Sequence, residues 1–205
     1  MDIPILFEDD ALVVINKPSG LVVNRAQSVK EKTVEDWAHE KFTSGIDRSG
    51  VVHRIDKETS GVLIIAKRPE SFSELQRQFK NREIKKTYLA LVHGIIVPKE
   101  GEIRAPVGRL PWNPQRFGIV PEGKEAVTKY KVVKDNLVEL YPQTGRTHQI
   151  RVHLKYMNHP IVGDYLYAGR KTARDDRKLV PRMMLHAWKL TFVHPEVRDE
   201  ITVEA

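Results

Sequence analysis

Short apolar runs separated by polar turns predict that strands outnumber helices along this chain. Strand character is strongest where apolar residues are continuous, or alternate with polar ones, over about four to eight positions. Such segments are residues 11–15, 21–23, 62–66, 85–94, 126–133, 137–141, 183–194 and 200–205. Residues 98–125 are rich in Pro, Gly and charge, which predicts a long excursion from the core. Because strands and helices do not alternate regularly, the pattern favours an α+β fold over a doubly wound α/β fold.

Two segments, residues 33–42 and 71–80, combine helical spacing of apolar residues with a capping pair at the start. In a capping box, a Ser or Thr side chain and an acidic side chain three residues later each bond the other's backbone. The pairs are Thr33 with Asp36 and Ser71 with Glu74. The apolar stripes are Val34, Trp37 and Ala38 in the first segment and Phe72, Leu75 and Phe79 in the second. Both segments are therefore predicted to be helices with one buried face.

Residues 144–157, TGRTHQIRVHLKYM, predict a turn followed by a helix. Its expected buried stripe is Ile150, Leu154 and Met157. Its expected polar face is His148, Arg151 and Lys155, at positions i, i+3 and i+7. Most polar helix faces are simply solvated. Here the preceding Thr144-Gly145-Arg146-Thr147 adds backbone donors and positive charge that suit a phosphate.

Positive charge is concentrated in the middle of the chain. The whole sequence has 34 basic and 27 acidic residues, a net charge of +7. Residues 51–182 hold 26 basic against 14 acidic residues, whereas residues 1–50 hold 6 against 9. Within the middle part, residues 169–182 predict a basic loop that is mobile without a ligand. Charge kept for solubility alone would be spread more evenly, so the distribution favours a polyanionic partner.

Composition excludes several classes of protein. The chain has 40% hydrophobic and 30% charged residues, which is ordinary for a globular protein. No stretch approaches the ~18 apolar residues of a membrane span, and no basic segment precedes the first apolar one as in a secretory signal. The absence of Cys excludes disulfides, thiolate catalysis and the common zinc sites. We therefore expect a cytoplasmic protein that does not interact with membranes.

The most suggestive polar cluster stands directly in front of the apolar run at residues 62–66. His53, Arg54, Asp56 and Lys57 lie within five consecutive positions there. A rigid strand that follows such a cluster can aim a side chain into a cleft. An Asp that bonds its own turn is the commoner explanation when Asp56 is taken by itself. The basic segment at 144–155 shifts the balance towards a functional carboxylate.

Several enzyme classes do not fit the sequence. The spacing of the histidines at 148, 153 and 159 differs from that of a zinc-binding H-E-x-x-H helix. In HRID, Ile55 interrupts the kinase H-R-D, and neither a Gly-rich nucleotide loop nor a D-F-G is present. The hydrolase G-x-S-x-G elbow, the Walker A motif and the dinucleotide fingerprint are also absent. A carboxylate in a basic setting remains, for which we expect neither a cofactor nor a metal.

Five sequence blocks resemble RNA pseudouridine synthases of the RluA-like family. They are LVVINKPSGLVV, HRIDKETSG with VLIIAK, KKTYLALVHG, TGRTHQIRVHLKYMNHPIVGDYLY and RMMLHAWKLTFVHP. The resemblance covers nearly the whole chain, with Ile55 where the family usually has Leu. It implies one catalytic domain over residues 1–205, without a separate N-terminal RNA-binding module. The implied fold is a mixed, mainly antiparallel sheet with flanking helices and a central RNA-binding cleft.

The resemblance also implies a role for individual residues. Asp56 matches the nucleophilic aspartate, whose attack falls on C6 of uracil or on C1′ of the ribose. Arg151 matches the basic residue that pairs with it, and Tyr88 matches the aromatic residue that packs on the target base. Arg54 matches a residue that fills the space of the flipped nucleotide. The expected substrate-binding residues are Arg54, His53, Thr59, Arg146, His148 and Lys155.

The expected function is isomerisation of specific uridines in structured ribosomal or transfer RNA to pseudouridine. RNA is the expected partner, and no obligate protein partner is implied. Two alternatives remain: a catalytically silent RNA-binding or assembly factor with the same fold, and a carboxylate-dependent hydrolase that releases uracil. The stretch at residues 108–118, which mixes Arg109 and Arg116 with Trp112 and Phe117, either grips RNA or folds onto the core.

Overall fold

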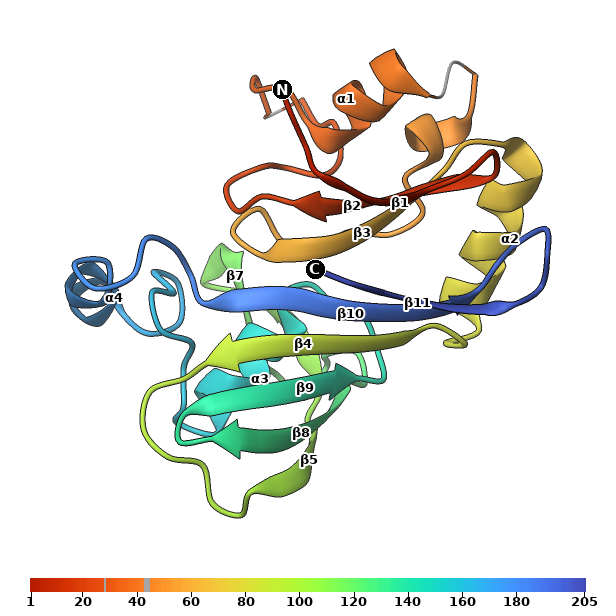
Figure 1. Ribbon diagram of the computed structural model, residues 1–205. Helices are drawn as coiled ribbons and strands as arrows, with labels where there is room; N and C mark the ends of the chain where they lie inside the picture. The colour runs from red at the N-terminus through yellow and green to blue at the C-terminus, as the bar shows by residue number, and fades with distance from the viewer. Residues whose placement is uncertain (28, 43–44) are drawn as a thin grey trace. The chain divides into compact units, whose positions relative to one another are not determined.

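The computed structural model describes residues 1–27, 29–42 and 45–205. The chain forms two compact units, one made of residues 1–86 and 187–205 and the other of residues 87–186 (Figure 1). The chain passes from one unit to the other within two strands, β4 (Lys85–Leu91) and β10 (Leu185–Val193). No helix in the described residues is both long and apolar enough to span a bilayer.

The first unit is built on an antiparallel sheet in which β3 (Ser60–Ala66) is central. Its other strands are β1 (Ile5–Glu8), β2 (Leu12–Lys17), β10 and β11 (Glu200–Glu204). Strand β2 pairs with β3 in unbroken register from Leu12 opposite Ala66 to Lys17 opposite Gly61. Helices α1 (Val34–Lys41) and α2 (Pro69–Lys80) and a short 3₁₀ segment, η1 (Asp47–Gly50), complete the unit. Every residue of β3 is buried, so this strand is a rigid support for the loop before it.

Gly61 allows β3 and β10 to approach closely. Its φ of +114° is strained for any residue with a side chain, and a Cβ there would lie 2.1 Å from the carbonyl oxygen of Ala187. A larger residue at position 61 would therefore force the two strands apart.

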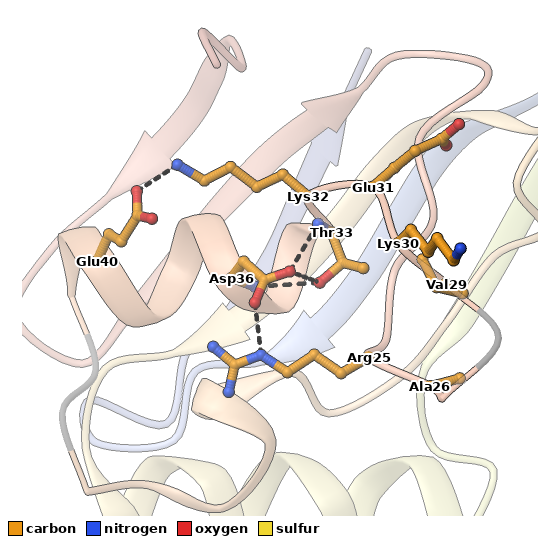
Figure 2. A pocket seen from close by; sticks show the side chains of 9 residues that line it. All are labelled: Arg25, Ala26, Val29, Lys30, Glu31, Lys32, Thr33, Asp36 and Glu40. Atoms are coloured by element: carbon orange, nitrogen blue, oxygen red, sulfur yellow. Dashed lines mark hydrogen bonds and ion pairs between the residues drawn. The ribbon is translucent and has the colours of Figure 1, made fainter.

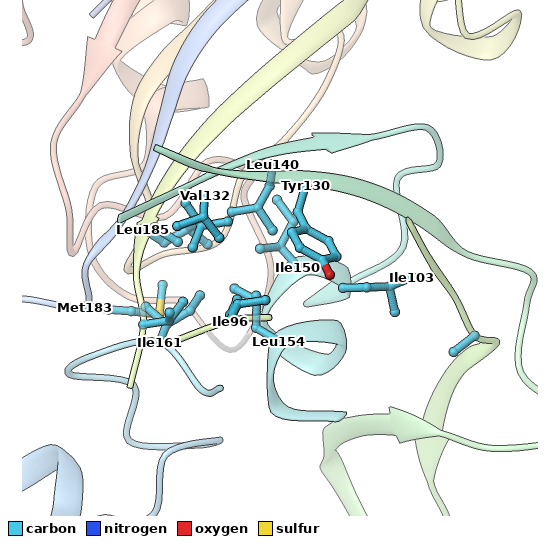
Figure 3. Packing of buried hydrophobic residues seen from close by; sticks show 14 residues of the cluster. Ile96, Ile103, Tyr130, Val132, Leu140, Ile150, Leu154, Ile161, Met183 and Leu185 are labelled. Atoms are coloured by element: carbon cyan, nitrogen blue, oxygen red, sulfur yellow. The ribbon is translucent and has the colours of Figure 1, made fainter. Parts of the chain in front are cut away.

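The second unit contains four neighbouring strands of an antiparallel sheet and a separate hairpin. The sheet order is β4, β9 (Leu137–Pro142), β8 (Val127–Lys134) and β5 (Glu100–Arg104). The hairpin consists of β6 (Val107–Leu110) and β7 (Asn113–Ile119). The helices are α3 (Gln149–Tyr156) and α4 (Arg170–Asp176). Ile150 and Leu154 of α3 pack among the sheet residues Tyr130, Val132 and Leu140 (Figure 3).

Most predicted elements are confirmed. The strands recorded in the two sheets pair antiparallel, and four α-helices accompany them, so the α+β prediction is correct. Thr33 and Asp36 form the predicted capping box of α1, and Val34, Trp37 and Ala38 are buried. The proposal of one catalytic domain with a central cleft stays a prediction.

One strand prediction in the first unit is wrong, and one strand was not predicted. Residues 21–23 form no strand, because the carbonyls of Val22 and Val23 accept hydrogen bonds from Val34 and Glu35 at the start of α1. These carbonyls satisfy helix donors that otherwise lack partners. The sequence pattern also missed β1, a short edge strand with exposed or half-buried residues.

The predicted capping box of the second helix is also wrong. Helix α2 begins two residues earlier than expected, with Arg68 as N-cap and Pro69 in the first turn. Proline suits the first helical position, because the backbone N–H there has no partner within the helix. Ser71 therefore lies inside the helix and is buried.

Two predicted loops contain regular structure. Residues 98–125 are not an excursion, since β5 pairs with β8 in the sheet and β6 pairs with β7. Residues 169–182, predicted to be a mobile loop, contain helix α4. Gly169 takes a φ of +93° directly before α4, and Ala173 within the helix is fully buried. The polar and charged composition of this segment therefore did not reveal its short helix.

Candidate active site

Asp56 lies in a tight turn directly before β3. Its backbone carbonyl accepts a hydrogen bond from the N–H of Thr59 at 3.1 Å, and its side chain is half-buried. Thr59 is 2% exposed, and the buried strand starts at the next residue. The turn therefore has little freedom at its C-terminal end, which holds the position of Asp56 relative to the sheet.

Lys17 at the end of β2 fixes the other side of this turn. Its ammonium group is fully buried and donates to the carbonyls of Pro18 and Leu21 at 2.8 Å and of Lys57 at 3.1 Å. The neighbouring residues Ser19 and Gly20 add two bonds, from the Ser19 hydroxyl to the Glu58 carbonyl and from the Gly20 N–H to the Lys57 carbonyl. Backbone atoms on both residues after Asp56 are thus held by the NKPSG turn.

Burial and nearby carboxylates have opposite effects on the pKa of Lys17. Burial lowers the pKa of Lys17 to about 8, and the negative charges of Asp56 and Glu58 partly oppose that shift. A buried ammonium group is costly unless it is hydrogen-bonded and close to opposite charge. The pKa of Lys17 therefore depends both on its burial at the end of β2 and on the charge of Asp56. Lys17 was not singled out in the sequence.

His53 has a structural role, because its ring contacts both β3 and α2. Its Nε2 accepts a hydrogen bond from the N–H of Ile64 at 3.1 Å, and its ring stacks on Phe79 with the ring centroids 4.4 Å apart. Burial lowers the pKa of His53 to about 3, and the charge of Lys86 adds to that shift. The ring is therefore neutral near pH 7. Arg54, by contrast, is exposed, and the predicted contacts of both residues with a substrate stay predictions.

Tyr88 lies on β4 in the second unit. It stands opposite Leu140 of β9 and packs against the buried cluster that contains Ala90 and Val138. Ala90 and Val92, two and four residues further along the chain, are buried. Tyr88 is half-buried, so its ring is held in place by packing.

Helix α3 begins one residue later than its polar pattern predicts. His148 is the N-cap in a left-handed conformation, with φ 57°, so it does not share a helical face with Arg151 and Lys155. The predicted i, i+3, i+7 face is therefore wrong at its first position. Lys155 is exposed on the last turn of α3, as predicted.

A buried polar network fixes the start of α3. Gln149 donates to the Val127 carbonyl and the Thr128 hydroxyl at 3.0 Å and accepts from Thr144 and from the Arg146 N–H. Arg146 also donates from Nε to the Glu125 carbonyl at 3.0 Å. Because buried polar groups are costly without partners, this satisfied network holds the helix start against β8.

Arg151 is buried and carries a two-point ion pair with Asp164. Its Nε and one terminal nitrogen lie 2.7 and 2.9 Å from the two carboxylate oxygens, and the Asp164 side chain is fully buried. Two parallel bonds between guanidinium and carboxylate fix the plane of the arginine. Asp164 was not singled out in the sequence, because 13 residues separate it from Arg151.

The pocket at the start of α1 does not contain the predicted site residues. Its lining includes Arg25, Lys32, Asp36 and Glu40 (Figure 2). These charges pair with each other, Arg25 with Asp36 at 2.6 Å and Lys32 with Glu40 at 2.5 Å. Asp36 also caps the helix, and its hydrogen bonds to Thr33 lower its pKa to about 2. The arrangement is that of a helix start with its charges satisfied. In the described part of the chain, no three His, Asp or Glu side chains gather as a metal site would require.

Comparison with known proteins identifies the family. A family described as RNA pseudouridylate synthase matches residues 11–156, a range that includes Lys17, Asp56, Tyr88 and Arg151. The chain belongs to this pseudouridine synthase family. Asp164 lies beyond the matched range.

Named relatives agree with the family. Ribosomal large subunit pseudouridine synthase D of Neisseria meningitidis serogroup B is 39% identical over 100% of this chain and 58% of its own length. The uncharacterized RNA pseudouridine synthase YlyB of Bacillus subtilis is 40% identical over 100% of this chain and 69% of its own length. Human RNA Pseudouridylate Synthase Domain Containing 1 shares the fold with a TM-score of 0.79 and 29% identity, over 100% of this chain and 83% of that one. The chain thus spans about three-fifths of the length of the first of these relatives.

Proposed function

We propose that this protein isomerises uridine in RNA to pseudouridine, with Asp56 as the nucleophile. The family match over residues 11–156, which contains the HRIDKETSG block, carries the proposal. The clamped turn around Asp56 supports it, because a nucleophile must be held in one geometry to react efficiently. The negative charge of Asp56 opposes the lowering of the Lys17 pKa by burial, so the two side chains interact electrostatically.

The proposed reaction is balanced without any co-reactant. The carboxylate of Asp56 attacks C6 of uracil or C1′ of the ribose, and the bond between N1 and C1′ breaks. The uracil turns, a bond forms between C5 and C1′, and the bond to Asp56 breaks, which regenerates the carboxylate. C5 releases its proton while N1 gains one. Because nothing is oxidised or reduced overall, the reaction needs no redox cofactor.

Each remaining site residue has a proposed role in this reaction. A uridine has to leave its stack to react, which costs a few kcal/mol, and stacking on an aromatic ring returns about 1–3 kcal/mol per base. Tyr88 is proposed to provide that ring and Arg151 to provide positive charge at the reacting carboxylate. Arg54, exposed beside Asp56, is proposed to fill the space of the flipped nucleotide. The remaining proposed substrate contacts are His53, Thr59, Arg146, His148 and Lys155.

Large-subunit ribosomal RNA is the substrate we propose to test first, because that is what the names of the Neisseria relatives specify. Transfer RNA is the second candidate substrate. The expected cytoplasmic location is consistent with either RNA and stays a prediction.

Release of tritium from RNA labelled at C5 of uridine tests the proposal. Wild-type protein is expected to release the label and leave pseudouridine, and Asp56→Asn is expected to release none while binding RNA within a few-fold. Asp10→Asn is the matched control, because the Asp10 side chain is 91% exposed. RNA binding without any release of label would support the silent binding factor instead, and free uracil would support the hydrolase.

A further inference from the structure

Tyr167 touches three separate parts of the second unit. Its hydroxyl oxygen accepts a hydrogen bond from the N–H of Phe117 on β7 at 3.1 Å. The same oxygen lies 2.9 Å from Nδ1 of His148, the N-cap of α3. The guanidinium carbon of Arg151 lies 5.0 Å from the centroid of its ring. One buried side chain, 7% exposed, therefore joins the hairpin, the start of α3 and the proposed catalytic arginine.

Asp164 fixes both members of the stack between Arg151 and Tyr167. One carboxylate oxygen accepts from the backbone N–H groups of Leu166 and Tyr167, at 2.9 and 3.2 Å. The two oxygens together hold Arg151 through the ion pair described above. The backbone that carries the tyrosine ring and the guanidinium that lies over it thus share one anchor. Neither can shift without breaking bonds to Asp164.

The hairpin held by Tyr167 has the composition of a surface that grips single-stranded nucleic acid. Trp112 at its tip is 78% exposed. Arg109 lies over the ring of Phe117, with its guanidinium carbon 5.2 Å from the centroid, and Arg116 lies 5.9 Å from the centroid of Tyr167. Exposed aromatic rings stack on bases, and arginines bind phosphates or stack themselves. Phe117 packs on the core, whereas Trp112 stays exposed. Of the two alternatives for residues 108–118, folding onto the core therefore applies to Phe117, and gripping RNA is left to Trp112.

We propose that Tyr167 is a positioning residue that couples the β6–β7 hairpin to Arg151. RNA gripped at the hairpin tip is then held in one register relative to Arg151, because Tyr167 joins the hairpin backbone to the guanidinium. Asp164 supports the same link, because it bonds both the guanidinium of Arg151 and the backbone N–H of Tyr167. This inference rests on the proposed function, since it concerns how the substrate of that reaction is placed.

A double-mutant cycle between Tyr167→Phe and Trp112→Ala tests the coupling. Tyr167→Phe keeps the ring under Arg151 and removes only the two hydroxyl contacts. We expect each single variant to lower kcat/KM for transcribed large-subunit ribosomal RNA about tenfold, mainly through a higher KM. Because a displaced hairpin no longer presents Trp112, the double variant is expected to lose about tenfold as well, whereas independent effects would multiply to about a hundredfold.

Tyr165→Phe is the matched control. Tyr165 lies on the same turn, is 46% exposed and packs its ring against Arg177, so loss of its hydroxyl is expected to leave kcat/KM within about twofold. Hydrogen exchange across β7 provides a second measurement that does not depend on catalysis. Exchange is expected to rise in Tyr167→Phe and to stay unchanged in Tyr165→Phe.

Three results would overturn the coupling while leaving the proposed function intact. They are multiplicative losses in the double variant, full activity of Trp112→Ala, and unchanged hydrogen exchange of β7 in Tyr167→Phe. Failure of the wild-type protein to release label from any RNA would instead reject the proposed function, and the exchange measurement would still judge the link between Tyr167 and β7.

Discussion

The ammonium group of Lys17 donates a hydrogen bond to the backbone carbonyl of Lys57, the residue after Asp56, at 3.1 Å. A buried lysine at the end of one strand thus holds the turn that leads into the next. Its charge is opposed by burial and supported by Asp56 and Glu58. The position of the proposed nucleophile therefore depends on a lysine whose charge Asp56 itself supports, although 40 positions separate Lys17 from Lys57.

Lys17→Met is expected to lower turnover about 10- to 100-fold, because a loss of positioning near one ångström can cost about that much. The variant keeps the apolar stem and removes all three donated hydrogen bonds. Tritium release under single-turnover conditions measures the effect, with exposed Lys30→Met as the control. Turnover equal to that of the wild type would show that the Ser19 and Gly20 contacts hold the turn on their own.

Asp56→Asn is expected to lower the pKa of Lys17 further below about 8. The reason is that the carboxylate favours the charged lysine, and the amide does not. A ¹³C NMR titration of the lysine Cε resonances measures this shift, and Asp10→Asn should leave it unchanged. A Lys17 pKa that rises in Asp56→Asn would contradict the electrostatic link.

Protein stability is expected to fall with pH below about 6.5 because of His53. The unfolded chain protonates this ring near pH 6.5, whereas the folded protein protonates it only near pH 3. Between these values the unfolded state binds more protons, so the free energy of unfolding decreases as the pH falls. Roughly 2 kcal/mol of the loss between pH 6.5 and 4.5 is expected to come from His53.

His53→Gln isolates this contribution, because the Gln oxygen can still accept from the Ile64 N–H. In urea unfolding at several pH values, the free energy of unfolding is expected to decrease less at acidic pH in His53→Gln than in the wild type. The exposed His39→Gln is the control and should keep the wild-type slope. Equal slopes in all three proteins would mean that other groups cause the acid loss.

Helix α4 is expected to contribute phosphate contacts. Arg170, Lys171 and Arg174 are exposed on it, whereas Arg177 donates to the Gly163 carbonyl and Lys178 pairs with Asp175. Replacing the three exposed residues by Ala is expected to weaken RNA affinity and to reduce the salt slope by about one for each phosphate that is no longer neutralised. Filter binding at several salt concentrations measures the slope, with Lys30→Ala combined with Lys80→Ala as the control. An unchanged slope would place the RNA elsewhere.

Capping pairs and helical spacing predicted the parts of the fold that depend on residues close together in the sequence. The Thr33–Asp36 box joins residues three positions apart, and the buried faces of α1 and α2 follow from helical spacing. In α3 the pattern was insufficient, because the first six residues of the helix are all buried, Arg151 included. The same reasoning failed at Ser71, because Pro69 had already set the helix start. It failed at residues 21–23 because their carbonyls serve α1 and not a neighbouring strand.

The site residues that sequence reasoning missed depend on contacts between distant positions. Lys17 reaches Lys57, Asp164 reaches Arg151, and the Tyr167 hydroxyl reaches the backbone of Phe117, which precedes it by 50 residues. No period or spacing links such pairs in a single sequence. A buried lysine between the apolar end of β2 and a proline was the one available signal, since an unpaired lysine is rarely placed there.

The close approach at Gly61 ties the turn of Asp56 to a much later part of the chain. Ala187, the residue that a side chain at position 61 would strike, follows it by 126 positions. During synthesis the ribosome makes β3 long before β10, so the nascent sheet has an open edge beside the strand that carries this turn. This edge of β3 is therefore completed only once Ala187 has emerged from the ribosome, whereas the Lys17 contacts that hold the turn can form earlier.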